Sequence, residues 1–334
     1  MASIKDVAKR AGVSSATVSR VLANKPHVRP ELQERVLTAV RELDYRPNLV
    51  ARSLRVQQSN IVGLVVSDIQ NPFFTAISRA VEDAAYAEGM NVFLCNTDED
   101  PAKEVSYLNL MRDAHVAGAI LSPTLQTAGS LADVLDPAWP LVVIDRRVQD
   151  ADVDTVVLDN VDSAQRLVDH LIEHGHRRIA ALTGITSATG RERHQGYLRS
   201  LRAHGLDAPA GLTRRVPPRQ QDGYQAANEL LAMDPPPDAI VATNSLLTLG
   251  ALNAIRDRGL RIPDDVALVG FDDTTWAALV DPPITVVCQP TYELGQTAAE
   301  LLFRRLENPD RPTREVVLKG KLIVRGSCGH HEKS

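Results

Sequence analysis

From Ile61 onward, short apolar runs alternate with amphipathic helix patterns, and this alternation constrains the fold more than any other feature. Runs such as Ile61–Val66, Ala119–Leu121 and Leu141–Ile144 are followed by segments with helical periodicity or by turns. The pattern indicates right-handed βαβ units and parallel sheets. Because about 270 residues exceed one compact sheet, we predict two Rossmann-like lobes with a ligand cleft at the strand carboxyl ends.

The first 58 residues have a different character from the rest of the chain. Residues 4–44 show helix signals alone, and Gly12 permits the positive φ of a tight turn between the first two of three short helices. This segment holds 11 Lys and Arg against 5 Asp and Glu, a net charge of +6, whereas the remainder carries −11. A basic head on an acidic body indicates a polyanionic partner for the head alone.

Composition excludes several classes of protein. The N-terminus has no apolar core of a signal peptide, and no run is long enough to span a membrane, so we expect a cytoplasmic protein without a membrane partner. Cys95, Cys288 and Cys328 are scattered and form neither a disulfide framework nor a zinc motif. No GxGxxG, phosphate loop, GxSxG or HExxH motif occurs, so we expect no enzyme, no catalytic residue, no cofactor and no metal.

Residues 4–22 read as two helices of a helix-turn-helix unit. The second helix carries small polar side chains on its outer face near its N-terminus, where base edges of the major groove would lie. Arg20 has the planar fork that pairs with guanine. Lys5, Lys9, Arg29 and Arg35 are candidates for neutralising phosphates, which adds affinity without sequence information.

The chain resembles the LacI/GalR family of bacterial transcription regulators over nearly its whole length. The resemblance rests on Ile-Lys-Asp-Val-Ala at 4–8, Ala-Thr-Val-Ser-Arg-Val-Leu at 16–22, Tyr-Arg-Pro-Asn at 45–48 and Ala-Arg-Ser-Leu at 51–54. It implies a homodimer on a pseudo-palindromic double-stranded operator, with a hinge helix and a leucine wedge in the minor groove. Together with the charge argument above, it gives as candidate DNA-binding residues Ser15, Ala16, Thr17, Arg20, Lys5, Arg29, Leu54 and Arg55.

The same resemblance places an effector site in the body. Arg193 matches the arginine that holds the effector, and Asp272 follows a buried strand in Gly-Phe-Asp-Asp. An arginine facing an aspartate suits vicinal hydroxyls or a ring edge. The candidate effector-binding residues are Phe73, Asp145, Arg193, Asn244, Asp272, Trp276 and Gln289.

The chain departs from the family at Ser245, where an aspartate is usual, so a second carboxylate there is in doubt. Trp276 is either a stacking platform for a sugar face or a packing residue of the lobe. Members of the family that use nucleobases or phosphorylated protein partners share this scaffold. The identity of the effector therefore does not carry over.

These observations predict an all-α DNA-binding head joined to an α/β sensor of two parallel-sheet lobes, of the type I periplasmic-binding-protein kind. The expected segments are a head at 1–46, a hinge and linker at 47–60, a sensor at 61–327 and a tail at 328–334. The N-lobe spans 61–158 and 289–318, and the C-lobe spans 159–288 and 319–327. The predicted function is repression controlled by a sugar or sugar derivative. The alternatives are a nucleobase, a phosphoprotein co-regulator and, last, a Rossmann-lobed enzyme; a periplasmic sugar-binding protein is excluded by the head.

Overall fold

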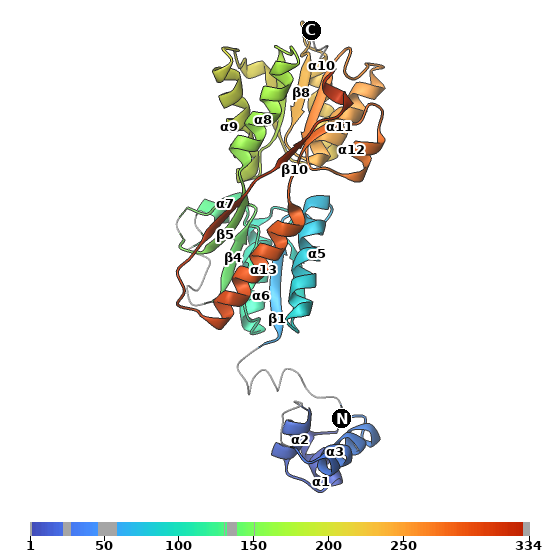
Figure 1. Ribbon diagram of the computed structural model, residues 1–334, viewed down its shortest axis with the longest axis vertical. Coiled ribbons are helices and arrows are strands. Elements are labelled where there is room, and N and C mark those ends of the chain that lie inside the picture. Colours follow the sequence, from blue (N-terminus) through green and yellow to red (C-terminus); the bar gives the residue numbers. More distant parts are fainter. Residues whose placement is uncertain are drawn as a thin grey trace. The chain divides into compact units, whose positions relative to one another are not determined.

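The protein divides into two compact units, Met1–Ser59 and Asn60–Ser334, in a computed structural model (Figure 1). The structure describes residues 2–22, 28–45, 59–129, 131, 139–149 and 151–329. Within these ranges, no helix has the length and apolar character that a membrane crossing requires.

The first unit contains three described helices: α1 (Ile4–Ala11), α2 (Ser15–Leu22) and α3 (Pro30–Glu42). Ser3 and Asp6 form a reciprocal capping box at the start of α1, and Gly12 ends that helix at φ 64°. Val7, Val18 and Val36, one from each helix, are fully buried. This small core fixes the angle between α1 and α2.

The N-lobe of the second unit is built on a six-stranded parallel sheet in the order β11-β5-β4-β3-β1-β2. Its strands are β1 (Ile61–Val66), β2 (Asn91–Asn96), β3 (Ala119–Leu121), β4 (Leu141–Ile144), β5 (Asp154–Leu158) and β11 (Glu315–Leu318). Its helices are α5 (Pro72–Ala87), α6 (Pro101–Asp113), α7 (Leu125–Gly129) and α13 (Thr291–Glu307). The central strands are buried on both faces, which explains their continuous apolar sequences.

The C-lobe repeats this plan with the order β12-β10-β9-β8-β6-β7, in which only the β10–β12 pairing is antiparallel. Its strands are β6 (Ile179–Gly184), β7 (Thr213–Val216), β8 (Ala239–Ala242), β9 (Ala267–Phe271), β10 (Thr285–Cys288) and β12 (Lys321–Ile323). Its helices are α8 (Asn160–Glu173), α9 (Ala188–Ala203), α10 (Gln220–Leu231), α11 (Ser245–Asp257) and α12 (Thr275–Leu279), with 3-10 turns at Ala210–Leu212 and Gly326–Cys328.

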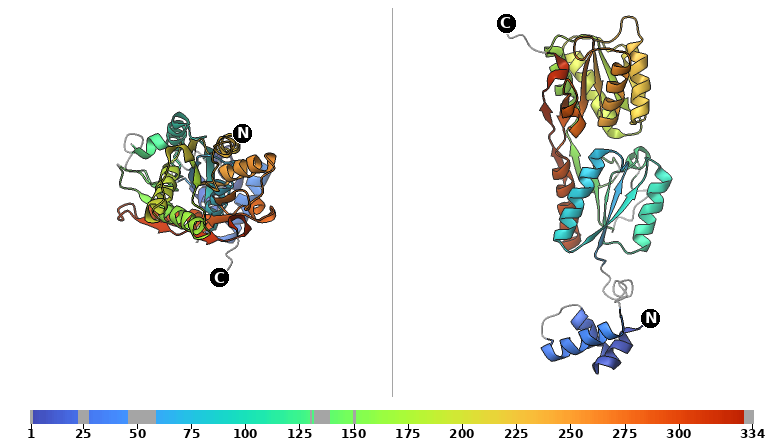
Figure 2. Two further views of the ribbon diagram at one scale, coloured as in Figure 1. Left: turned by 90° about the horizontal axis from the view of Figure 1, so that it is seen from above. Right: turned by 90° about the vertical axis from the view of Figure 1, so that its right-hand side faces the viewer.

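Among the described residues, three crossovers join the lobes, where the chain passes from β5 to α8, from β10 to α13, and from β11 to β12. Both lobes are therefore assembled from segments far apart in the sequence. Figure 2 shows helices on both faces of each sheet. Each sheet accordingly has a separate hydrophobic cluster on either side. This is the predicted two-lobed architecture, and it brings the carboxyl ends of both sheets to one region.

Candidate functional site

A cavity of about 800 Å³ lies in the second unit, lined by residues that follow strands of both sheets. Six of the seven effector-binding residues predicted from the sequence line it: Phe73, Asp145, Arg193, Asn244, Asp272 and Gln289. Their sequence positions span more than two hundred residues, and the parallel strand ends bring them together. The cavity therefore has the position expected for a ligand site in open α/β sheets.

Trp276 is the predicted residue that does not line the cavity. It is partly buried and packs against the hydrophobic cluster that joins the C-lobe sheet to α10 and α11. The structure thus places this tryptophan as a packing residue, since α12 holds it against the lobe.

The C-lobe wall is organised around Arg193, which α9 presents to the cavity at 5% exposure. Its Nε donates to Asn160 Oδ1 at 2.8 Å, and its Nη1 donates to the carbonyl of Thr243 at 2.6 Å. The guanidinium lies over the ring of Phe271, 4.2 Å from its centroid. All three partners are uncharged. Burial lowers the pKa of Arg193, and the carboxylates of Asp272 and Asp145 oppose that effect.

Asp272 lies beside this arginine in a left-handed conformation, at φ 71° directly after β9. Its Oδ1 accepts from Gln289 Nε2 at 2.6 Å, and its Oδ2 accepts from the backbone N–H of Ser245 at 3.1 Å. Gln289 Oε1 is buried and has no hydrogen-bond partner among the described residues. A ligand with a hydroxyl donor would satisfy that oxygen.

Asn244 has a structural task besides facing the cavity. Its Oδ1 accepts from the N–H of Leu247 at 2.8 Å and so caps α11. Its Nδ2 donates to the carbonyl of Pro218 at 3.4 Å. The asparagine predicted to contact a ligand therefore also holds two cavity-lining segments together.

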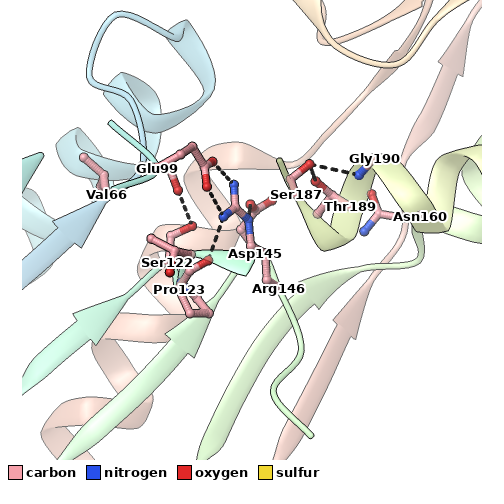
Figure 3. Close-up of polar contacts among 12 residues, drawn as sticks. Val66, Glu99, Ser122, Pro123, Asp145, Arg146, Asn160, Ser187, Thr189 and Gly190 are labelled. Carbon is pink, nitrogen blue, oxygen red and sulfur yellow. Dashed lines mark hydrogen bonds and ion pairs between the residues drawn. The ribbon is translucent and has the colours of Figure 1, made fainter. Parts of the chain in front are cut away.

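The N-lobe wall contains Asp145 and Arg146, which follow β4 (Figure 3). Arg146 is 3% exposed and forms two contacts with the carboxylate of Glu99, one of them at 2.9 Å, and a hydrogen bond to the carbonyl of Pro123 at 2.6 Å. Asp145 Oδ2 lies 3.3 Å from Arg146 Nε. Burial raises the pKa of Asp145 to about 6, and the positive charges of Arg146 and Arg193 offset part of that rise. Like Asp272, Asp145 has a φ of 71°.

Apolar and hydroxyl groups complete the lining. Phe73 and Phe74 are both buried at the start of α5 and meet edge to face, 5.0 Å between centroids. Across the cavity, Ser187 caps α9 by accepting from the N–H of Gly190 at 3.1 Å (Figure 3). A Cβ on Gly190 would lie 2.2 Å from the carbonyl oxygen of Gly184, so this close approach of helix and strand requires glycine.

Sequence reasoning missed several lining residues, including Arg146, Glu99, Thr189 and Arg219. Arg146 had a visible signal, because it follows the end of a predicted strand beside a predicted site residue. Glu99 had none, since its significance comes from a partner 47 positions away.

The head presents the predicted recognition residues on its surface. On α2, the exposed residues include Ser15, Ala16 and Arg20. Thr17 is partly buried, and its backbone N–H donates to Ser14 Oγ at 3.2 Å. Ser14 is therefore the cap of α2.

The candidate phosphate contacts differ in how far the fold itself uses them. Lys5 and Arg29 are exposed. Arg35, also a candidate, donates from Nη2 to the carbonyl of Ala11 at 2.6 Å and so helps to close the end of α1. Leu54 and Arg55 lie outside the described residues.

A helical DNA-reading head and a two-lobed receptor with a polar interlobe cavity together define a ligand-responsive DNA-binding regulator. Residues 3–48 match the family described as "Bacterial regulatory proteins, lacI family", and residues 168–328 match the "Periplasmic binding protein-like domain".

Relatives match over nearly the whole chain. The HTH-type transcriptional repressor PurR of Mannheimia succiniciproducens is 33% identical over 98% of each chain. The ribose operon repressor of Halalkalibacterium halodurans is 36% identical over 100% of this chain and 99% of its own. The protein belongs to the lacI family and is a transcriptional repressor of that family with a DNA-binding head and a ligand-binding domain.

Solved structures of transcriptional regulators also align with nearly the whole chain. The transcriptional regulator CelR in complex with cellobiose aligns with a TM-score of 0.73 at 33% identity, covering 98% of this chain and 100% of that one. The lac repressor dimer bound to operator and the anti-inducer ONPF aligns with a TM-score of 0.88 at 27% identity, covering 98% and 99%.

Proposed function

We propose that the protein represses transcription as a homodimer on a pseudo-palindromic operator and that an uncharged, hydroxyl-rich effector, a sugar or sugar derivative, binds between its lobes. The observation that carries the effector class is that Arg193 faces the cavity on the same wall as the hydrogen-bonded pair of Asp272 and Gln289. The effector changes the operator affinity by favouring one arrangement of the lobes. A coupling of about 1–3 kcal/mol changes that affinity 5- to 150-fold.

Sugar hydroxyls both donate and accept hydrogen bonds, and the cavity offers both kinds of partner. Asp272 and Gln289 Oε1 supply acceptors, and Arg193 retains Nη2 as a donor beyond its bonds to Asn160 and Thr243. Phe73 provides an apolar surface against which the C–H groups of a sugar ring can pack. This mixture of partners supports a small polyol.

The charges lining the cavity disfavour an anionic effector such as a sugar phosphate. Arg146, one of three lining arginines, is engaged by Glu99 and lies beside Asp145. The lining carboxylates outnumber the arginines: they are Asp68, Asp98, Glu99, Asp145 and Asp272, against Arg146, Arg193 and Arg219. A phosphate would be repelled by this excess of negative charge.

The dimer and operator parts of the proposal are supported by the lac repressor dimer bound to its operator. The N-lobe also exposes apolar side chains that a second copy would bury: Leu94 on the edge strand β2, and Val105 and Leu110 on α6, at 42%, 37% and 49% exposure. Exposed apolar groups on one lobe fit an interface better than a solvated face.

A thermal-shift screen of the full-length protein tests the effector class, with D-ribose, cellobiose, D-ribose 5-phosphate and hypoxanthine as probes. A neutral sugar is expected to raise the melting temperature, because a ligand selective for the native state stabilises it by mass action. The phosphate ester is expected to have no effect. A response to hypoxanthine alone would replace the sugar with a nucleobase.

Operator binding is tested separately. Full-length protein is used to select binders from a pool of random inverted repeats. Preference for one inverted repeat over random duplex, with affinity that falls steeply as salt increases, is the expected result. Equal binding to every duplex would reject a sequence-specific repressor.

A further inference from the structure

We propose that Glu192 is a positioning residue that couples Arg193, the arginine facing the effector, to the relative orientation of the two lobes. This inference rests on the proposed function, since it concerns how binding at that cavity is transmitted. Glu192 is adjacent to Arg193 in the sequence but does not itself line the cavity.

The first observation is an ion pair that crosses from one lobe to the other. Arg147 follows β4 in the N-lobe, and its Nη1 lies 3.2 Å from Oε1 of Glu192 on α9 in the C-lobe. Both side chains are partly sheltered, at 39% and 23% exposure. The other face of Arg147 is held within its own lobe, where Nε and Nη2 lie 2.9 and 2.8 Å from Glu315 Oε1.

The second observation links Glu192 to the arginine in the cavity. Glu192 Oε2 accepts from Asn160 Nδ2 at 2.8 Å, and Asn160 Oδ1 accepts from Arg193 Nε at 2.8 Å. The amide of Asn160 therefore joins two consecutive residues of α9. Asn160 is 1% exposed and begins α8, immediately after the crossover from β5. The chain of contacts thus runs from the cavity to a connection between the lobes.

The position of this pair distinguishes it from the other ion pairs of the described residues. Those in the second unit join partners within one lobe, such as Arg305 with Asp154 or Arg325 with Asp273. The Arg147–Glu192 pair depends on how the lobes are oriented, so it contributes differently to each arrangement.

A ligand shifts a conformational equilibrium only through contacts that differ between the states. A hydroxyl that draws Arg193 toward the cavity acts on Asn160 and, through it, on the carboxylate that Arg147 contacts. Conversely, a change of lobe orientation alters the Arg147–Glu192 contact and thereby the support of Arg193. This contiguous path supplies the reciprocal coupling that allosteric control requires.

Three substitutions separate this role from simple structural support. Glu192→Gln removes the charge that faces Arg147 but keeps an oxygen to accept from Asn160. Arg147→Met removes the other partner. Glu315→Gln is the matched control, because it removes a carboxylate from the same arginine without touching the C-lobe.

The measurement is a double-mutant cycle on the full-length dimer with the selected operator, with and without D-ribose or cellobiose. Glu192→Gln and Arg147→Met are each expected to change the ratio of the two operator dissociation constants by about 2- to 5-fold, the size of a partly exposed ion pair. The double variant is expected to match either single variant, and Glu315→Gln to leave the ratio unchanged.

A further variant tests the link to Arg193. Glu192→Leu also removes the acceptor for Asn160, so the affinity for the bound sugar is expected to fall by about 2- to 10-fold, whereas Glu192→Gln retains it. Additive effects in the cycle, an unchanged ratio in Glu192→Gln, or an equal shift in Glu315→Gln would overturn the proposal.

Failure of the effector class would be recognised independently. If neither sugar binds the wild type, the sugar proposal fails, and the same cycle is evaluated on the operator affinities without sugar. Non-additivity there supports the coupling by Glu192, and additivity rejects it.

Discussion

Each wall of the cavity combines a buried arginine with an aspartate that follows a central strand at a φ of 71°. On the N-lobe side, Arg146 contacts two carboxylates and a carbonyl oxygen of the protein itself. On the C-lobe side, Arg193 contacts an amide oxygen, a carbonyl oxygen and an aromatic ring, all uncharged. Similar residues thus have different roles. Arg146 neutralises the carboxylates of Glu99 and Asp145 in its own lobe, whereas the positive charge of Arg193 and its Nη2 donor stay available to a ligand.

The largest expected effect follows from removing the neutralising arginine. Arg146→Met removes the cation that contacts the buried carboxylate of Asp145 and the partly buried carboxylate of Glu99. The free energy of unfolding in urea is expected to fall by about 3–5 kcal/mol, the typical cost of breaking a buried pair. Arg79→Met is the control, since its ion pair with Asp83 is exposed and screened by solvent, so its loss should leave the stability nearly unchanged. Equal losses for both variants would contradict the role assigned to Arg146.

The second effect concerns recognition. Arg193→Ala is expected to weaken the binding of the sugar by about 10- to 150-fold, because a charge-assisted hydrogen bond contributes about 1.5–3 kcal/mol. Calorimetric titration measures this loss, and a mobility-shift assay should show that operator binding survives. Arg191→Ala provides the control from an exposed position on the same helix. An unchanged titration with Arg193→Ala would remove the distinction between the two walls.

The third effect is a pH dependence confined to the N-lobe wall. In the folded protein the pKa of Asp145 is about 6, above its usual 3.8, because burial disfavours the charged carboxylate. Protons therefore bind the folded state more tightly, and the stability contributed by this residue falls as the pH rises from 3.8 through about 6. Asn at this position stays neutral and tolerates the left-handed conformation.

Asp145→Asn is accordingly expected to be more stable than the wild type by about 2–3 kcal/mol near pH 7.5 and by about half as much near pH 5. Urea unfolding at the two pH values measures the difference. Titratable groups that do not interact with Asp145 are common to both proteins and cancel. A difference that grows on acidification would contradict the raised pKa of Asp145.

Much of this arrangement could be predicted from the sequence, because the family resemblance indicated candidate residues and strand–helix alternation places strand ends at one edge of a parallel sheet. Six of the predicted residues, on widely separated segments, line one cavity. The alternation did not reveal β7, whose sequence Thr-Arg-Arg-Val lies at the edge of its sheet and is only partly buried. Edge strands lack the continuous apolar run that marks a central one.

The features that sequence reasoning missed depend on partners distant along the chain. Glu99 gains its significance from Arg146, and Glu192 from Arg147, and no local pattern specifies either pair. For Trp276 the sequence left two interpretations open, a stacking surface or a packing residue of the lobe. Local pattern could not choose between them, because the choice depends on how α12 packs this side chain against the hydrophobic cluster of the C-lobe.

The smallest expected effect tests that placement. Because Trp276 packs against the C-lobe cluster and does not line the cavity, Trp276→Phe should change the affinity for the sugar by less than about 2-fold. It should lower the free energy of unfolding by about 1–3 kcal/mol, since a smaller ring leaves space in the packing. Phe73→Leu, which alters a residue of the cavity wall, is expected to weaken binding by about 3- to 10-fold through lost contact with the ring face. If Trp276→Phe loses more affinity for the sugar than Phe73→Leu does, α12 takes part in recognition, and the ligand site extends beyond the two walls that carry Arg146 and Arg193.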